Sequence, residues 1–261
     1  MSEPKIRRQP IHLHLTNADA VVPADHAPLF SRFASLAAAV NQAWQQRADV
    51  SSDRADVSRL IAVIGDFLPL MQSLDTQYGA DGELPMADAV DAIDEVLHAS
   101  AALDGWLERL EITGQRENLH ALQLGTGYWA MRHHLPLSAV APLVNALATQ
   151  SNRAESRQET AAVYALMQGF IQHLEPALHA DLERSNPERP WRLLNLNFAI
   201  TAIRTGDAAM MRFAFDTLNA HLPDECAGFY EEAATLAADP RFPPETRALI
   251  EGERATWARV H

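Results

Sequence analysis

Apolar residues recur every three or four positions from residue 29 almost to the C-terminus, and this period constrains the fold more than any other feature. The first such segment places apolar side chains at Leu29, Phe33, Leu36, Val40 and Trp44. That spacing is typical of an α-helix with one buried face, whereas a half-buried strand alternates every second residue. No strand pattern of comparable length is present. The sequence therefore predicts an all-α protein.

Turn-forming residues divide the periodic region into separate helices. Residues 29–113 are predicted to hold three long helices, with Pro69 as a kink or break in the second. Thr205-Gly206-Asp207 shows how other breaks arise, because glycine can end one helix and aspartate can cap the next. Beyond Gly114 we expect antiparallel helix pairs at 115–135 with 138–150, 155–174 with 176–185, 190–205 with 207–221, and 223–239 with 243–260.

Residues 1–28 are interpreted as an extended arm. Four prolines in this segment rule out a long helix. His12 and His14 alternate with three apolar residues, which indicates one short extended stretch. The two histidines could bind a metal from one face of this stretch, but they are more simply its polar side.

Two segments beyond Gly114 carry a spacing typical of closely packed helix pairs. Within residues 118–150, Leu124 and Gly125 are followed by Tyr128. Within residues 190–223, a small residue, a turn, an aromatic residue and a closing proline occur in order at Ala199, Gly206-Asp207, Phe215 and Pro223. Both segments resemble the tetratricopeptide repeat. The resemblance implies that residues 114–261 form a tetratricopeptide-like α-solenoid of antiparallel helix pairs, packed on an N-terminal helical bundle of residues 29–113.

The stretch Leu124-Gly125-Thr126-Gly127 also raises the possibility of a phosphate-binding loop. Such a loop needs its glycines between a strand and a helix, together with a lysine or an acidic partner. Neither condition is met here. A small residue also lets two helices approach closely, so we expect Gly125 to serve helix packing.

The resemblance further implies which side chains line the groove of the array. The first-helix positions, transferred through the two matching segments, are Leu122, Thr126, Trp129, Leu196, Ile200 and Arg204. An exposed Trp129 beside an arginine would suit an extended peptide or its carboxylate. The prediction depends on that exposure, and a buried Trp129 would overturn it.

The balance of charge excludes several kinds of partner. The chain has 21 lysine and arginine residues against 34 aspartate and glutamate residues, a formal net charge of −13. Nucleic acids and anionic membranes attract basic surfaces, so neither is predicted as a partner. Many acids fall in a row that we call the acidic row: Asp88, Asp91, Asp94 and Glu95. It is either a solvated helix face or a dock for a basic segment such as the chain's own Lys5-Ile6-Arg7-Arg8.

Lysine and cysteine occur only once each, as Lys5 and Cys226. A single lysine in the N-terminal arm excludes Schiff-base, pyridoxal and P-loop enzymes, which need a lysine in a folded site. A single cysteine excludes an internal disulfide and a cysteine-cluster metal site, and we expect Cys226 to be a small packed thiol. The sequence shows neither a signal-peptide pattern nor a membrane-length apolar run, which predicts a cytoplasmic protein.

Two Glu-x-x-His pairs suggest an alternative hypothesis, that the protein is an enzyme. The pairs are Glu95 with His98 and Glu117 with His120. Such pairs on facing helices can hold a di-iron or di-manganese centre. A hairpin turn near Gly114 would place the two histidines at different levels, since each residue advances a helix by about 1.5 Å. The more ordinary interpretation is therefore two solvated pairs.

The sequence leads to one preferred function and two alternatives. We expect a non-enzymatic interaction or scaffold protein, without a cofactor, that binds a peptide or partner segment in a helical groove. The first alternative is a helical metalloenzyme of the ferritin-like or haem-oxygenase-like type that uses the two Glu-x-x-His pairs. The second is a structural subunit that buries an apolar edge in a homodimer.

Overall fold

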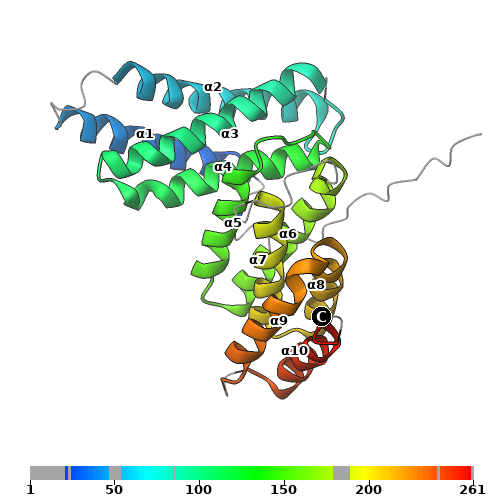
Figure 1. Cartoon of the computed structure of the whole chain (residues 1–261). Coiled ribbons are helices and arrows are strands. Elements are labelled where there is room, and N and C mark those ends of the chain that lie inside the picture. The colour runs from blue at the N-terminus through cyan, green and yellow to red at the C-terminus, as the bar shows by residue number, and fades with distance from the viewer. Residues whose placement is uncertain are drawn as a thin grey trace, which may run out of the picture.

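The computed structural model describes residues 21–22, 25–46, 54–84, 86–178, 189–239 and 242–259. Within these residues the chain forms ten α-helices and one short 3-10 helix, and no strand. The prediction of an all-α protein is confirmed. Figure 1 shows two groups of helices, with α1–α4 lying across the top and α5–α10 descending below them. Most of the predicted arm, including its histidines and the segment from Lys5 to Arg8, lies outside the described residues.

The first group is an antiparallel four-helix bundle of α1 (Ala27–Gln45), α2 (Arg54–Tyr78), α3 (Met86–Arg109) and α4 (Arg116–Arg132). Each helix packs against the next along the chain, and α4 packs back against α1. A 3-10 turn, Thr113–Gln115, connects α3 to α4. α2 continues through Pro69, which is exposed, so the proline does not break it. The bundle thus includes a fourth helix beyond the three that the sequence assigned to it.

The second group consists of α5 (Ala141–Arg153), α6 (Arg157–Leu178), α7 (Pro190–Thr205), α8 (Ala208–His221), α9 (Pro223–Ala237) and α10 (Pro244–Trp257). Successive helices pack against one another, and α5 also contacts α7, as α8 contacts α10. The predicted break at Pro176 is wrong, because α6 continues to Leu178. A proline removes only one backbone hydrogen bond, and the helix continues past it. The rest of the predicted 176–185 helix lies outside the described residues.

α4 connects the two groups, because it packs against α1 and α3 in the bundle and against α5 and α6 in the second group. A Cβ atom at Gly125 would lie 2.8 Å from the side chain of Leu29 in α1. At Gly127 it would lie 2.6 Å from Leu143 in α5 and 2.9 Å from Phe170 in α6. The two glycines therefore allow neighbouring helices to approach α4 on two sides, and the packing role predicted for Gly125 is confirmed.

The turn between α7 and α8 follows the predicted capping pattern. Gly206 ends α7 in the left-handed conformation with φ of 68°, which costs glycine little. The side chain of Asp207 accepts hydrogen bonds from the backbone N–H groups of Ala209 and Met210 at the start of α8. These bonds satisfy two of the amide groups that a helix start leaves unpaired.

Between Asp56 and Tyr78, α2 is long and apolar enough to cross a membrane by length and composition alone, with a mean hydropathy of 1.3. Core helices of soluble proteins can share these properties, so length and hydropathy do not by themselves identify a membrane helix. In this structure α2 packs against α3 and α1 in the bundle.

Candidate functional site

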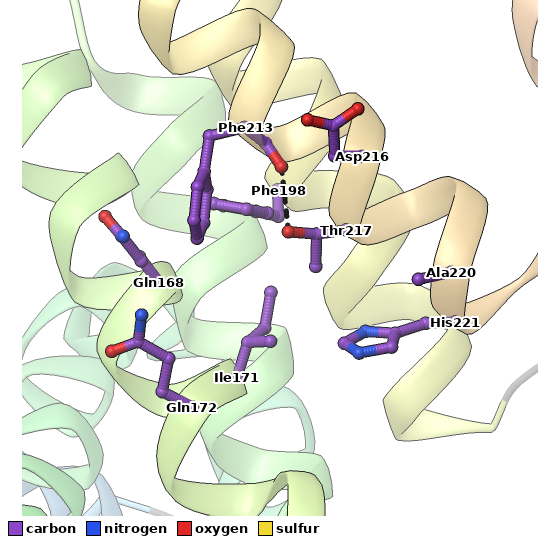
Figure 2. A pocket seen from close by; sticks show the side chains of 9 residues that line it. All are labelled: Gln168, Ile171, Gln172, Phe198, Phe213, Asp216, Thr217, Ala220 and His221. Carbon is purple, nitrogen blue, oxygen red and sulfur yellow. Dashed lines mark hydrogen bonds between the residues drawn. The ribbon is translucent and has the colours of Figure 1, made fainter.

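A groove with a volume of about 410 Å³ lies between α6, α7 and α8. Three helices supply its lining: Gln168, Ile171 and Gln172 from α6, Phe198 from α7, and Phe213, Asp216, Thr217, Ala220 and His221 from α8. Figure 2 shows these side chains around an open centre, with the glutamines of α6 at the left, Phe213 above them, and Thr217, Ala220 and His221 of α8 at the right. We call this feature the α6–α8 groove.

Two phenylalanines form an aromatic wall of the groove. Phe198 is fully buried and stacks on Tyr164, with ring centroids 4.6 Å apart. Phe213 meets Phe198 edge to face at 6.3 Å, and 42% of its surface is exposed. Most exposed residues are polar, and a large apolar side chain with this exposure beside a cavity marks a place where another apolar group can be buried.

Two glutamines form the opposite wall, one turn apart on α6. Gln168 is half-buried and Gln172 is exposed. Within the described part of the chain, neither amide makes a hydrogen bond to another residue. Each side-chain amide carries a donor NH₂ and an acceptor oxygen. The wall therefore offers both kinds of hydrogen-bonding group to whatever enters the groove.

The polar side chains of α8 are arranged differently. Thr217 donates its hydroxyl hydrogen to the backbone oxygen of Phe213 at 2.8 Å, as the dashed line in Figure 2 shows. The Nδ1 atom of His221 lies 2.9 Å from Oδ1 of Asn195, and its ring packs 4.8 Å from that of Trp191. These contacts hold Thr217 and His221 in place, whereas Asp216 is exposed.

The three residues of α4 that were predicted to line a groove are buried. Leu122, Thr126 and Trp129 are each at most 3% exposed. Trp129 packs edge-on against Phe67 at 5.7 Å and donates its indole hydrogen to Asp75 at 2.7 Å. The prediction of a peptide site around an exposed Trp129 is therefore wrong. It fails because helices on several sides enclose α4, so no face of its middle section remains for a ligand.

The three predicted residues of α7 are more accessible but do not line the α6–α8 groove. Leu196 is half-buried and Ile200 is 43% exposed. Arg204 donates to the backbone oxygens of Ser151 and Ala154, at the end of α5, where a cation interacts favourably with the helix dipole. The groove instead receives Phe198, two residues from Leu196 and from Ile200 and so about 200° away around a helix.

The acidic row is only partly free to act as a dock. Asp91 and Glu95 are exposed on α3. Asp94 already accepts hydrogen bonds from the backbone N–H groups of Ser138 and Ala139, at 3.3 and 3.4 Å, and from the Ser138 hydroxyl. It therefore holds the turn before α5. The side chain of Asp88 lies outside the described residues.

The residues of the alternative metal site are not brought together. Nδ1 of His98 lies 2.7 Å from the backbone oxygen of Asp94, in its own helix. Glu117 is exposed and lies 3.3 Å from Arg153, and burial lowers the pKa of the half-buried His120. In the described ranges, no three His, Cys, Asp or Glu residues, including Glu95, form a group able to hold a metal ion. The di-metal prediction is therefore not supported by the geometry.

Asp75, which sequence reasoning missed, lies at the centre of a polar cluster that joins α1, α2 and α4. It accepts the indole hydrogen of Trp129 at 2.7 Å, and it lies 2.8 Å from Nε2 of His133 and 2.9 Å from Nε2 of His26. Burial raises the pKa of Asp75, but these hydrogen bonds outweigh burial and leave the pKa below its ordinary value. The partners are 49 to 58 residues away in sequence, so no local signal could have identified them.

The ring of His133 is fixed from both sides in this cluster. Its Nε2 faces the carboxylate of Asp75, and its Nδ1 lies 2.7 Å from the backbone oxygen of Gly82. A carboxylate and a carbonyl both accept hydrogen bonds, so each ring nitrogen of His133 faces an acceptor. His133 is buried against Asp75, whereas its neighbour His134 is exposed.

Cys226 is a packed thiol, as expected from the sequence. It is fully buried, and its Sγ lies 3.3 Å from Oδ1 of Asn219 and from the backbone oxygen of Leu222. Burial and nearby acidic groups raise its thiol pKa to about 12. Asn219 also accepts hydrogen bonds from Tyr230 at 2.9 Å and Trp257 at 3.1 Å, so it joins α8 to α9 and α10.

Comparison with known proteins gives no match: no family model, no curated protein and no solved structure is similar to this chain. The functional argument therefore rests on the groove, the charges and the packing of this molecule.

Proposed function

We propose that this protein is a non-enzymatic interaction protein that binds an extended segment of a partner protein in the α6–α8 groove. The observation that carries the proposal is the pairing of a half-exposed aromatic side chain, Phe213, with two free amides, Gln168 and Gln172, across an open cavity. Apolar anchors and hydrogen bonds to the peptide backbone are two of the ways in which grooves hold peptides.

The spacing of the two glutamines supports an extended ligand. Four residues advance an α-helix by about 6 Å, and two residues of an extended chain span about 6.6–6.8 Å. Gln168 and Gln172 can therefore meet alternate peptide groups of a strand-like segment that runs along α6. A helical ligand would satisfy its own backbone groups and would leave both amides without partners.

The aromatic wall supports an apolar anchor on the same segment. Phe213 is held by its contact with Phe198, and Ile171 lies at the base of the groove. A side chain inserted beside Phe213 would bury apolar surface on both molecules, which stabilises the complex by about 25 cal/mol per Å² removed from water. We also propose that residues 114–261 form the tetratricopeptide-like array that the sequence resembles, with the groove on it.

The proposal can be tested with displayed random peptides of about twelve residues, a length that spans roughly 40 Å when extended. Peptides selected on the wild-type protein are then measured by fluorescence anisotropy against Phe213→Ala and against a Gln168→Ala, Gln172→Ala double variant. We expect either change to weaken binding about tenfold or more, because anchors at the centre of an interface carry much of its affinity. All three substituted side chains are exposed or half-buried, so the fold is expected to tolerate the changes.

Ile200→Ala is the matched control, because Ile200 is 43% exposed on α7 yet does not line the groove. Its affinity for the selected peptides should equal that of the wild type. The proposal fails if no peptide binds more tightly than about 1 mM, a binding free energy of about −4 kcal/mol. It also fails if Ile200→Ala weakens binding as much as Phe213→Ala does.

A further inference from the structure

The α6–α8 groove carries one negative charge that nothing in the described structure neutralises. Asp216 is exposed at the rim and forms no hydrogen bond or ion pair with any described residue. The nearest arginine along α8, Arg212, lies one turn earlier and is paired with Glu245 of α10 at 3.6 Å. Asp216 therefore lies at the rim of the groove without a cation of its own.

The other titratable group of the lining, His221, has contacts of its own. His221 lies about a turn and a half further along α8, with Nδ1 against Asn195 and its ring against Trp191. The remaining lining residues are apolar, amide or hydroxyl side chains. With a formal net charge of −13 on the whole chain, the long-range field also attracts cations.

We infer that the α6–α8 groove selects partner segments that carry a lysine or arginine next to an apolar anchor. This inference rests on the proposed function and adds the chemistry of the ligand. Asp216 follows Phe213 by three residues, which places it about 4.5 Å further along the helix axis. An extended chain advances about 3.3 Å per residue. The basic side chain is therefore one or two residues from the anchor, on the side toward the C-terminal end of α8.

An acidic segment would be rejected by the same arrangement. A carboxylate at that position would lie near Asp216 at the rim of a groove whose described lining has no arginine or lysine. Selectivity for charge would then come from repulsion of the wrong ligand as well as attraction of the right one. Anchor and charge are thus separate requirements, and they can be tested separately.

The test compares charge variants at two exposed aspartates. Asp216→Lys changes the charge inside the groove, and Asp91→Lys makes the same change on α3, away from the groove. Peptides selected on the wild-type protein should be enriched in lysine or arginine one or two residues from an apolar side chain. Asp216→Lys should weaken their binding about tenfold, because it turns an exposed attraction into a repulsion, and Asp91→Lys should change it less than about threefold.

Selection on Asp216→Lys itself should favour aspartate or glutamate at the same position beside the anchor. Equal preferences on wild type and Asp216→Lys, with binding still lost in Phe213→Ala, would overturn the basic-segment inference and leave the peptide groove intact. Equal weakening by Asp216→Lys and Asp91→Lys would overturn it too, since attraction would then depend only on net charge. If no peptide is selected at all, both the proposed function and the basic-segment inference fail.

Discussion

Asp75 makes hydrogen bonds to residues of two other helices, and the sequence around Asp75 gives no sign of them. Its carboxylate sits in α2, 13% exposed, and meets Trp129 and His133 near the end of α4 and His26 at the start of α1. Asp75→Asn removes the charge that pairs with His133 inside the molecule. Because hydrogen bonds to a charged group contribute about 1.5–3 kcal/mol and a lost acceptor leaves a buried donor unsatisfied, we expect the free energy of unfolding in urea to fall by about 2–4 kcal/mol.

The control for this prediction is Asp81→Asn in the loop between α2 and α3. Asp81 pairs with Arg132 at 2.9 Å, but its side chain is 79% exposed. An exposed pair contributes about 0–1 kcal/mol, so this variant should unfold close to the wild-type midpoint. Equal losses in the two variants would contradict the central role assigned to Asp75.

The lowered pKa of Asp75 predicts a specific dependence of stability on pH. A carboxyl whose pKa is lower in the folded state stabilises the fold fully above its unfolded value, about 3.9. The contribution is lost as pH falls through the lower folded pKa. The difference in unfolding free energy between wild type and Asp75→Asn should therefore still be present at pH 5 and should narrow below about pH 4. A difference that does not narrow there would contradict the hydrogen bonds assigned to this carboxylate.

The Cys226 thiol should be unreactive toward thiol reagents in the native protein. Its thiol is fully buried and its pKa is raised to about 12, so hardly any reactive thiolate exists at pH 8. With a disulfide reagent such as Ellman's reagent, native protein should react only as fast as it unfolds. Protein unfolded in guanidinium chloride should react completely at the rate of a free thiol. Full labelling of native protein within the mixing time would refute the packed-thiol assignment.

At the scale of elements, the close approach of helices at α4 depends on Gly127. An alanine Cβ there would lie 2.6 Å from Leu143 and 2.9 Å from Phe170, so both side chains must move. Overpacking of this kind costs about 1–3 kcal/mol, which exceeds the gain of up to about 1 kcal/mol from the better helix propensity of alanine. We expect Gly127→Ala to lower the thermal midpoint and the free energy of unfolding.

Gly105 supplies the matched control within α3. It is exposed, and a Cβ atom built there has no other atom within 4 Å. Gly105→Ala should therefore stabilise the protein by about 0.5–1 kcal/mol through helix propensity alone. The packing argument would be wrong if both substitutions shifted the thermal midpoint in the same direction.

Helix boundaries were predictable where a local signal sets them. Gly206 and Asp207 end α7 and cap α8 as expected, because left-handed backbone and a side-chain cap depend only on neighbouring residues. Pro176 was misread as a break, and Pro69, predicted as a kink or break, does not break α2, since the rest of each helix packs well enough to outweigh one lost backbone hydrogen bond. The length of a helix therefore depends on tertiary packing, even where the local sequence is enough to predict that a helix forms.

The candidate groove could not be predicted, because it depends on which helices become neighbours. Tryptophan is a residue type common in binding sites, but Trp129 is buried by helices that are distant from it in the sequence. On α7 the apolar residues occupy most of the helix surface, so periodicity did not distinguish the face with Phe198 from the face with Ile200. The resemblance to the tetratricopeptide repeat predicted that the face of α7 with Ile200 lines a groove. In the structure, α6 and α8 pack against α7 so that the face with Phe198 lines it instead.

At the scale of the whole molecule, the important question is whether the bundle and the second group unfold together. α4 is shared between them, with eleven of its seventeen residues buried. Gly125 contacts α1, and Gly127 contacts α5 and α6. Removing α4 from either group would expose apolar surface in the other, and this favours cooperative unfolding. The proposed groove would then be coupled to the stability of the distant bundle.

Hydrogen exchange of the slowest amides tests this coupling. Asp75→Asn weakens only contacts in the bundle, between α1, α2 and α4. If the molecule unfolds as one unit, the slowest amides of α3 and of α7 should lose protection by the same factor, about 30- to 1,000-fold for a loss of about 2–4 kcal/mol. Loss of protection in α3 alone would show that α5–α10 remain folded when the bundle opens. The groove would then be carried by an independent unit, and a fragment containing α5–α10 should bind the selected peptides by itself.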